Sequence, residues 1–190
     1  MYLFFDTETT GLPANYQAPA SDFNNWPRLV QVAWILTEGD AIQLEAAEYI
    51  IKPDGFTIPL DAAKIHGITT EKALAQGADL GAILQELKDK IEFATVLVAH
   101  NMQFDEKILG AEFLRRGFPN SIETKPRICT MRSSTDYCQI PGPYGYKWPS
   151  LQALHRKLFK KPIPSAHTAL ADTRACAACF FELKSLGILG

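Results

Sequence analysis

Short hydrophobic runs separated by polar turns divide the chain into elements. Five runs predict strands: Tyr2 to Phe5, Leu29 to Leu36, Ala46 to Ile51, Thr95 to Ala99, and Arg127 to Cys129. The turn-forming Glu38-Gly39-Asp40 separates the second run from the third, so we expect antiparallel neighbours there. The first run ends in two carboxylates and a Thr-Thr-Gly turn.

Apolar residues at helical spacing predict the helices. The expected segments are a short turn in IPLDAAKIHGIT ended by Gly67, then Leu80 to Glu92, Asp105 to Arg116, Met131 to Tyr137, Ser150 to Phe159, and a last helix after His167. That last helix is expected to place Cys176, Cys179, Leu183 and Leu186 on its inward stripe. Pro13 to Pro27, rich in Pro, Asn and aromatics, is too polar and too broken to be a core element. The prolines, glycines and aromatics of Ile140 to Pro149 exclude regular structure there.

This order of elements predicts an α/β fold. Three antiparallel strands are followed by helix, strand, helix, strand and closing helices, which indicates a mixed five-stranded sheet in a three-layer α/β/α arrangement. A chain of 190 residues with 47% hydrophobic content supports one substantial core, and no linker is evident. We therefore expect a single domain over residues 1–190.

Charge and cysteine content narrow the function classes. The net charge of -2 gives no overall basic field, which excludes a protein that coats long nucleic acid and requires a local site for any such partner. The chain opens directly into a strand and has no apolar run as long as a membrane helix, so we expect a soluble cytoplasmic protein. Four cysteines are too few for a disulfide framework, and Cys176 and Cys179 are interpreted as core residues rather than a redox or zinc pair.

Four carboxylates are the candidate chemistry. Asp6 and Glu8 project from the same face of the first strand because side chains alternate. By themselves they are more typical of a strand end facing water. Asp105 begins the apolar stripe of one helix, and Asp172 heads the stripe of the last, so both point inward.

Together these acids predict a metal site. Buried charges of one sign are prohibitive without a counter-charge, and two divalent ions about 4 Å apart are the arrangement used for in-line displacement at phosphorus. Ligands that are oxygen only favour Mg²⁺ or Mn²⁺ over Zn²⁺. No thiolate or paired imidazole signature accompanies the acids.

Three motifs carry a family resemblance. FDTETTG, HNMQFD and HTALADTRA, in that order, resemble the motifs of the DEDD exonuclease family. His167 stands five residues before Asp172, as in the DEDDh branch, whereas the tyrosine branch would need Tyr at the position of Thr168. IHGIT, from Ile65, and SLQALHRKLF, from Ser150, resemble further family segments. The branch includes the epsilon proofreading subunit of bacterial polymerases, ribonuclease T and oligoribonuclease.

The resemblance implies a ribonuclease H-like fold and 3'-to-5' exonuclease chemistry that releases nucleoside 5'-monophosphates from single-stranded ends. Asp6, Glu8, Asp105 and Asp172 would hold two Mg²⁺ or Mn²⁺ ions, with Asp6 between them. His167 would be the general base, a task that suits an imidazole with an ordinary pKa of about 6.5.

The resemblance also implies contacts to the terminal nucleotide from Thr9, Leu12, Ile65, His66 and Asn101. His66 is equally compatible with a half-exposed turn residue, and Asn101 with orienting either substrate or Asp105. His100 is expected to be a satisfied side chain at a strand end, and His155 to be solvated.

Several alternatives stay open at the level of sequence. The same motifs fit an RNA-specific exoribonuclease, and the fold also fits an endonuclease of the ribonuclease H type or a non-catalytic module that binds nucleic acid or a polymerase. The expected partners are single-stranded 3' ends and a polymerase or repair protein. Two groups of side chains have two interpretations each. The cations either contact phosphates or form a solvated helix face, and they are Arg156, Lys157, Lys160 and Lys161. The aromatics either stack on bases or pin the loops to the core, and they are Trp26, Tyr144, Tyr146 and Trp148.

Overall fold

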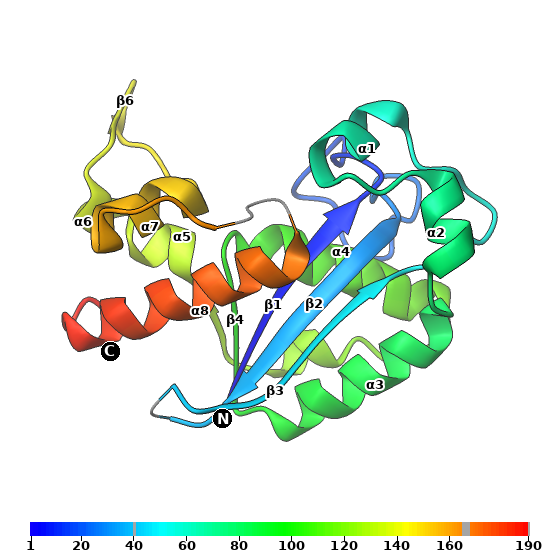
Figure 1. Cartoon of the computed structure of the whole chain (residues 1–190), viewed down its shortest axis with the longest axis horizontal. Helices are drawn as coiled ribbons and strands as arrows, with labels where there is room; N and C mark the ends of the chain where they lie inside the picture. The colour runs from blue at the N-terminus through cyan, green and yellow to red at the C-terminus, as the bar shows by residue number, and fades with distance from the viewer. Residues whose placement is uncertain (40, 165–167, 190) are drawn as a thin grey trace.

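A mixed sheet of five strands forms the centre of the fold in the computed structural model, which describes residues 1–39, 41–164 and 168–189 (Figure 1). Its strands are β1 Tyr2–Thr9, β2 Leu29–Thr37, β3 Gln43–Ile50, β4 Val96–Ala99 and β5 Arg127–Cys129. They lie in the order β3-β2-β1-β4-β5. β1, β2 and β3 pair antiparallel, whereas β4 runs parallel to both β1 and β5. The predicted five-stranded mixed sheet is confirmed.

Helices cover both faces of this sheet (Figure 1). They are α1 Leu60–His66, α2 Thr70–Gln76, α3 Leu80–Phe93, α4 Met102–Arg115, α5 Thr130–Ser133, α6 Thr135–Cys138, α7 Leu151–Phe159 and α8 Ala169–Ser185. α3 and α4 share a core with one face, and α8 packs on the other. α7 packs in turn on α8. None of the helices in the described ranges is long and apolar enough to cross a membrane.

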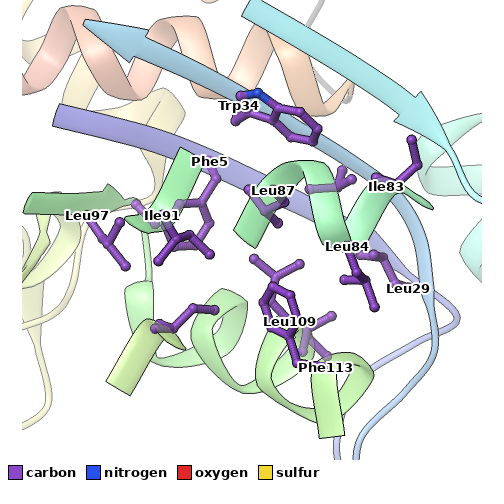
Figure 2. Close-up of a cluster of buried hydrophobic side chains, with 14 of the residues drawn as sticks. Phe5, Leu29, Trp34, Ile83, Leu84, Leu87, Ile91, Leu97, Leu109 and Phe113 are labelled. Atoms are coloured by element: carbon purple, nitrogen blue, oxygen red, sulfur yellow. The ribbon is translucent and has the colours of Figure 1, made fainter. Parts of the chain in front are cut away.

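β1 is buried on both faces, which explains its unbroken apolar run. Leu3 and Phe5 face the α3 and α4 core, shown in Figure 2. Phe4 faces the opposite way, toward α8, where its ring lies 5.3 Å from that of Phe180. Because side chains alternate, Asp6 continues the α8 side and Thr7 the α4 side.

Several boundaries differ from the sequence prediction. β1 runs through both of its acids to Thr9, α4 begins at Met102 rather than Asp105, and α2 was not predicted. In the predicted turn, Asp40 lies outside the described residues. The two short helices α5 and α6 replace the single one expected over residues 131–137.

The prediction that residues 140–149 lack regular structure was wrong. They form a small hairpin of β6, Pro141–Gly142, and β7, Gly145–Tyr146. The Lys147 amide donates to the Ile140 carbonyl at 2.9 Å, and Gly145 takes a positive φ of 119° that few other residues adopt. Prolines are tolerated because this hairpin is too short to need their missing amide hydrogens.

The end of the last helix also differs from its prediction, whereas the cysteines do not. α8 ends at Ser185, so Leu186 lies outside it and is half-exposed, against its predicted place on the inward stripe. Cys176 and Cys179 are buried in the core as predicted, and burial raises the pKa of both thiols. A thiol that stays protonated is inert, which fits a packing role.

A buried carboxylate anchors the segment from Pro13 to Pro27. Glu112 of α4 is fully buried and accepts from the Arg28 and Arg115 guanidinium groups at 2.8 and 3.0 Å and from the Leu29 amide at 3.1 Å. Arg115 also donates to the carbonyls of Phe23 and Trp26. These bonds fix the loop before β2.

The position of Trp26 decides between stacking on a base and pinning its loop to the core. Its ring is buried in the core, and its Nε1 donates to the Pro19 carbonyl at 2.9 Å. Trp26 therefore pins the loop to the core and offers no face for stacking on a base.

We expect Glu112→Ala to lower the free energy of unfolding by about 3–5 kcal/mol, because it leaves the half-buried Arg115 guanidinium without its carboxylate. Urea denaturation measures this change. The matched control is Glu92→Ala, whose exposed carboxylate pairs with Lys88 and should cost no more than about 1 kcal/mol. Equal losses for the two variants would contradict the anchoring role.

Candidate active site

The C-terminal half of β1 carries two carboxylates toward α8. Asp6 lies opposite Ala33 and Glu8 opposite Gln31 in the neighbouring strand β2. Both side chains are half-buried. The backbone pairing holds the two acids at a fixed spacing on one face, as the alternation predicts.

Two polar side chains from the sheet fix the start of α8. The Gln31 Oε1 accepts from the Ala169 amide at 3.2 Å, and the Glu48 Oε1 of β3 accepts from the Leu170 amide at 2.9 Å. Thr168 caps the same helix by accepting from the Ala171 amide. The first turn of α8, which carries Asp172, is thereby tied to β2, the neighbour of Glu8 in the sheet, and to β3 beyond it.

Three carboxylates meet as a result. Asp6, Glu8 and Asp172 each offer an oxygen, and these oxygens all lie within 4.8 Å of one another. The fourth predicted acid, Asp105, is buried with 2% of its surface exposed, and its Oδ1 accepts a 2.7 Å hydrogen bond from the Thr7 hydroxyl. It approaches from the α4 side and adds its charge to the field at Asp6.

Burial and like charges raise the pKa of these acids. Burial, followed by the charges of Asp105, Glu8 and Asp172, holds the pKa of Asp6 well above its ordinary value. Burial and then Asp172 raise the pKa of Glu8 to about 7. Burial raises the pKa of Asp105 to about 7 even though the Thr7 hydrogen bond opposes the shift.

The acid cluster fits a hard divalent cation. Carboxylate groups this close cannot all ionise cheaply, and each added positive charge would relieve both the burial cost and the repulsion. The converging donors are carboxylate oxygens with no sulfur or imidazole among the described residues. That chemistry matches the ligand preference of Mg²⁺ and Mn²⁺.

His167 lies outside the described residues, together with Ser165 and Ala166. Its neighbours on either side are described. Pro164 ends the segment after α7, and Thr168 caps α8 four residues before Asp172.

The predicted nucleotide contacts fall into two groups. Leu12 and Ile65 are apolar yet 75% and 65% exposed. Thr9 and His66 are buried: the Thr9 hydroxyl donates to the Gly11 carbonyl at 2.6 Å, and the His66 Nδ1 accepts from the Ile68 amide at 3.2 Å. The half-exposed interpretation of His66 is therefore wrong.

The polar residues of the second motif, HNMQFD, have different positions and partners in the structure. Asn101 begins α4 with a positive φ of 74°, and the bond to Asp105 comes from Thr7 rather than from Asn101. His100 is satisfied as predicted, with its ring nitrogens 2.9 Å from the Thr130 hydroxyl and 3.1 Å from the Pro149 carbonyl. His155 is half-buried against Phe159 rather than solvated.

Three positioning residues were missed in the sequence. Thr7 stands between the two acids of β1, and Gln31 and Glu48 hold α8. Gln31 could have been recognised, because it is a polar residue inside the apolar run LVQVAWIL of a strand buried on both faces. Neither Thr7 nor Glu48 stands out in this way, because Thr7 lies between two acids and the strand of Glu48 contains other polar residues. Their bonds to residues 98 and 122 positions away have no local pattern.

The sheet order, the two helical layers and the acid cluster define a ribonuclease H-like fold, and comparison with solved structures agrees. A zinc-bound crystal structure of an E. coli exonuclease I complex with single-stranded DNA superposes with a TM-score of 0.73 at 24% identity, over 97% of this chain and 40% of that one. The predicted fold class is confirmed.

The chain belongs to the exonuclease family, whose RNase_T model matches residues 3–180. It is 31% identical to a DNA polymerase III subunit epsilon-like protein of Rhodobacter capsulatus over 96% of this chain. It is also 28% identical to a PolC-type DNA polymerase III of Staphylococcus aureus over 99% of this chain. The chain spans 23% and 12% of the lengths of these two relatives. The family resemblance of the motifs is confirmed.

The raised pKa values predict how stability depends on pH in the absence of metal. Glu8 takes up its proton below about pH 7 in the folded chain, against an ordinary pKa of 4.5. The folded state therefore binds more protons between these values, and the free energy of unfolding falls as the pH rises through 7. In EDTA, Glu8→Gln should raise Tm above wild type at pH 8 by several degrees and leave it nearly unchanged at pH 4.

Differential scanning calorimetry from pH 4 to pH 8 measures this difference. Asp61→Asn is the matched control, because its carboxylate is exposed on α1 and should shift Tm little at either pH. If Tm changes with pH in the same way for Glu8→Gln and wild type, ionisation of Glu8 does not destabilise the folded chain.

Proposed function

We propose that this chain is a metal-dependent 3'-to-5' exonuclease that releases nucleoside 5'-monophosphates from single-stranded DNA ends. The observation that carries the proposal is the convergence of Asp6, Glu8 and Asp172 within 4.8 Å. Membership of the exonuclease family supports the same reaction class. Residues 1–190 would act as one exonuclease domain.

Asp6, Glu8, Asp105 and Asp172 would hold two Mg²⁺ or Mn²⁺ ions, with Asp6 shared. When bound, such ions neutralise the attacked phosphodiester and make a water more acidic near neutral pH. The chain contributes the geometry. Thr7 orients the Asp105 carboxylate through its hydrogen bond, and Gln31 holds the start of α8 so that Asp172 faces Glu8.

His167 would be the general base. It accepts a proton from the attacking water, the water oxygen bonds to phosphorus, and the bond from phosphorus to the 3' oxygen breaks. The departing 3' oxygen takes up a proton from solvent, so the shortened strand leaves with a 3'-hydroxyl and the terminal nucleotide leaves as its 5'-monophosphate. The imidazole has the right proton affinity for this step near pH 7.

The exposed apolar pair provides a place for the last nucleotide. Leu12 follows the acids of β1, and Ile65 lies on α1, which stands beside the end of β1 in Figure 1. Apolar side chains left in water are suited to the faces of a terminal base and sugar, and the buried Thr9 and His66 would add contacts to the same nucleotide. Asn101, at the start of α4, would complete this set from the second motif.

The relatives favour DNA over RNA as the polymer. Two of them are a polymerase III subunit-like protein and a PolC-type polymerase III, and the exonuclease I structure holds single-stranded DNA. A polymerase is the partner that these relatives suggest for this chain, and a repair protein stays a prediction from the sequence.

We expect Asp6→Asn to lower the rate of shortening of a 5'-labelled oligonucleotide by at least about 10³-fold, because the central carboxylate of the cluster is lost. Gel analysis in Mg²⁺ or Mn²⁺ measures the rate. Asp61→Asn on α1 is the matched control and should retain the wild-type rate. Full activity in EDTA, or cleavage of a circular single strand, would refute the proposal.

We expect His167→Ala to reduce kcat by about 10²- to 10⁴-fold, the range for losing a general base. Stabilisation of the variant by Mg²⁺ should match that of wild type, because the imidazole is not a metal ligand in this proposal. Rapid-quench kinetics and thermal unfolding with Mg²⁺ give the two measurements. An unchanged kcat would exclude His167 as the base.

A further inference from the structure

The segment of residues 125–164 has a charge opposite to that of the rest of the chain. It contains one acid, Asp136, and eight cations: Lys125, Arg127, Arg132, Lys147, Arg156, Lys157, Lys160 and Lys161. The other 150 residues contain eleven cations and twenty acids. A chain of net charge -2 thus concentrates its positive charge in about a fifth of its length. We call this segment the basic lobe.

Most of the basic lobe lies outside the central sheet. It begins with the edge strand β5 and continues through α5, α6, the β6–β7 hairpin and α7, and its hairpin projects away from the sheet in Figure 1. Leu154 and Cys138 pack against Cys179 and Leu183 of α8. Among the described residues, Arg127 alone of the eight cations forms a salt bridge, with Glu106. In the described part of the chain, no carboxylate therefore neutralises the positive charge of the other seven, although Lys125, Arg132 and Lys160 donate to neutral oxygen atoms.

Exposed aromatic rings stand among these cations. Tyr144 at the hairpin is fully exposed, and Tyr146 and Trp148 are half-exposed or more. The Arg132 guanidinium lies 5.4 Å from the centre of the Trp148 ring. Aromatic rings beside cations suit single-stranded nucleic acid, because its bases can stack on the rings while its phosphates pair with the cations. In a duplex the bases are not available for this stacking.

The basic lobe meets the sheet at the edge where Asp6 and Glu8 lie. β4 and β5 run parallel to β1, so the residues that follow them stand at the same edge as the C-terminal half of β1. His100, directly after β4, bridges Thr130 of α5 and Pro149 at the base of the hairpin. Arg132 donates to Gln103, two residues before Asp105. Arg127 and Arg132 also line a groove of about 770 Å³ beside α4.

We propose that the basic lobe binds the single-stranded nucleic acid on the 5' side of the reacting end, with phosphates on its cations and bases stacked on Tyr144, Tyr146 and Trp148. This deepens the proposed function, because it assigns the part of the substrate that lies beyond the terminal nucleotide. The surface would make affinity depend on strand length, while the acid cluster acts on the end.

Binding can be measured separately from cleavage. Fluorescence anisotropy of 5'-labelled dT20 with the intact chain in EDTA reports affinity when no cleavage occurs. Arg156→Gln with Lys160→Gln should weaken binding about tenfold at low salt and reduce the slope of log K against log salt by about 1.4, for two lost phosphate contacts. Tyr144→Ala should weaken binding at least about fivefold, and Tyr144→Phe should restore it.

Matched controls come from α3, on the opposite face of the sheet. Lys88→Gln with Lys90→Gln removes two charges there, and Phe93→Ala removes an exposed ring, so these variants should bind dT20 like wild type. Equal losses in the control and lobe variants would overturn the proposal, as would unchanged binding by the lobe variants. Polyphosphate competing as well as dT20 would refute the stacking contribution.

Binding by the basic lobe and exonuclease activity can fail independently of each other. If the wild-type chain binds dT20 through the basic lobe but never shortens an oligonucleotide in Mg²⁺ or Mn²⁺, the exonuclease proposal fails and the binding surface stands. If it shortens a dinucleotide and dT20 with equal kcat/KM, and the lobe variants leave both values unchanged, the basic lobe is refuted and the exonuclease stands.

Discussion

Electrostatic repulsion among carboxylates at the end of a strand that is buried on both faces is the constraint on which the site depends. β1 lies between α8 on one side and α3 and α4 on the other, so Asp6 and Glu8 stay half-buried and cannot turn fully into solvent. Their negative charges need a positive partner within the site. Without one, burial and repulsion disfavour the ionised forms and raise the pKa of both groups. A divalent cation is the compensation that also equips the site for phosphodiester chemistry.

Hydrogen bonds from outside the cluster keep the repelling groups together. Gln31 and Glu48 bind amides at the start of α8, while Thr7 binds Asp105 from the other face of β1. None of these three residues is an expected metal ligand, yet they hold the elements that carry Asp172 and Asp105. The polar network thus offsets part of the repulsion in the absence of metal, and the same rigidity presents the carboxylates ready for ions.

Charge is divided between two parts of the molecule. The acids needed for chemistry lie at the sheet, in a portion of the chain with a large excess of negative charge, and the cations gather in the basic lobe. A polyanionic substrate would be repelled by the first part without metal and attracted by the second. If the basic lobe binds the substrate as we propose, this separation allows a chain of net charge -2 to act on nucleic acid, with affinity and catalysis on different surfaces.

The sequence by itself determined the five strands and most helices, because apolar periodicity is a local property. The family and the acids of the cluster were recognised from three short motifs, each of them a continuous stretch of sequence. It missed α2 and the hairpin, where short segments carry too little pattern, and it could not tell whether Trp26 or His66 was exposed. Only the tertiary structure decided that Asp172 meets Glu8 while Asp105 is held by Thr7. These contacts join residues about a hundred or more positions apart, and their geometry depends on packing that no local pattern encodes.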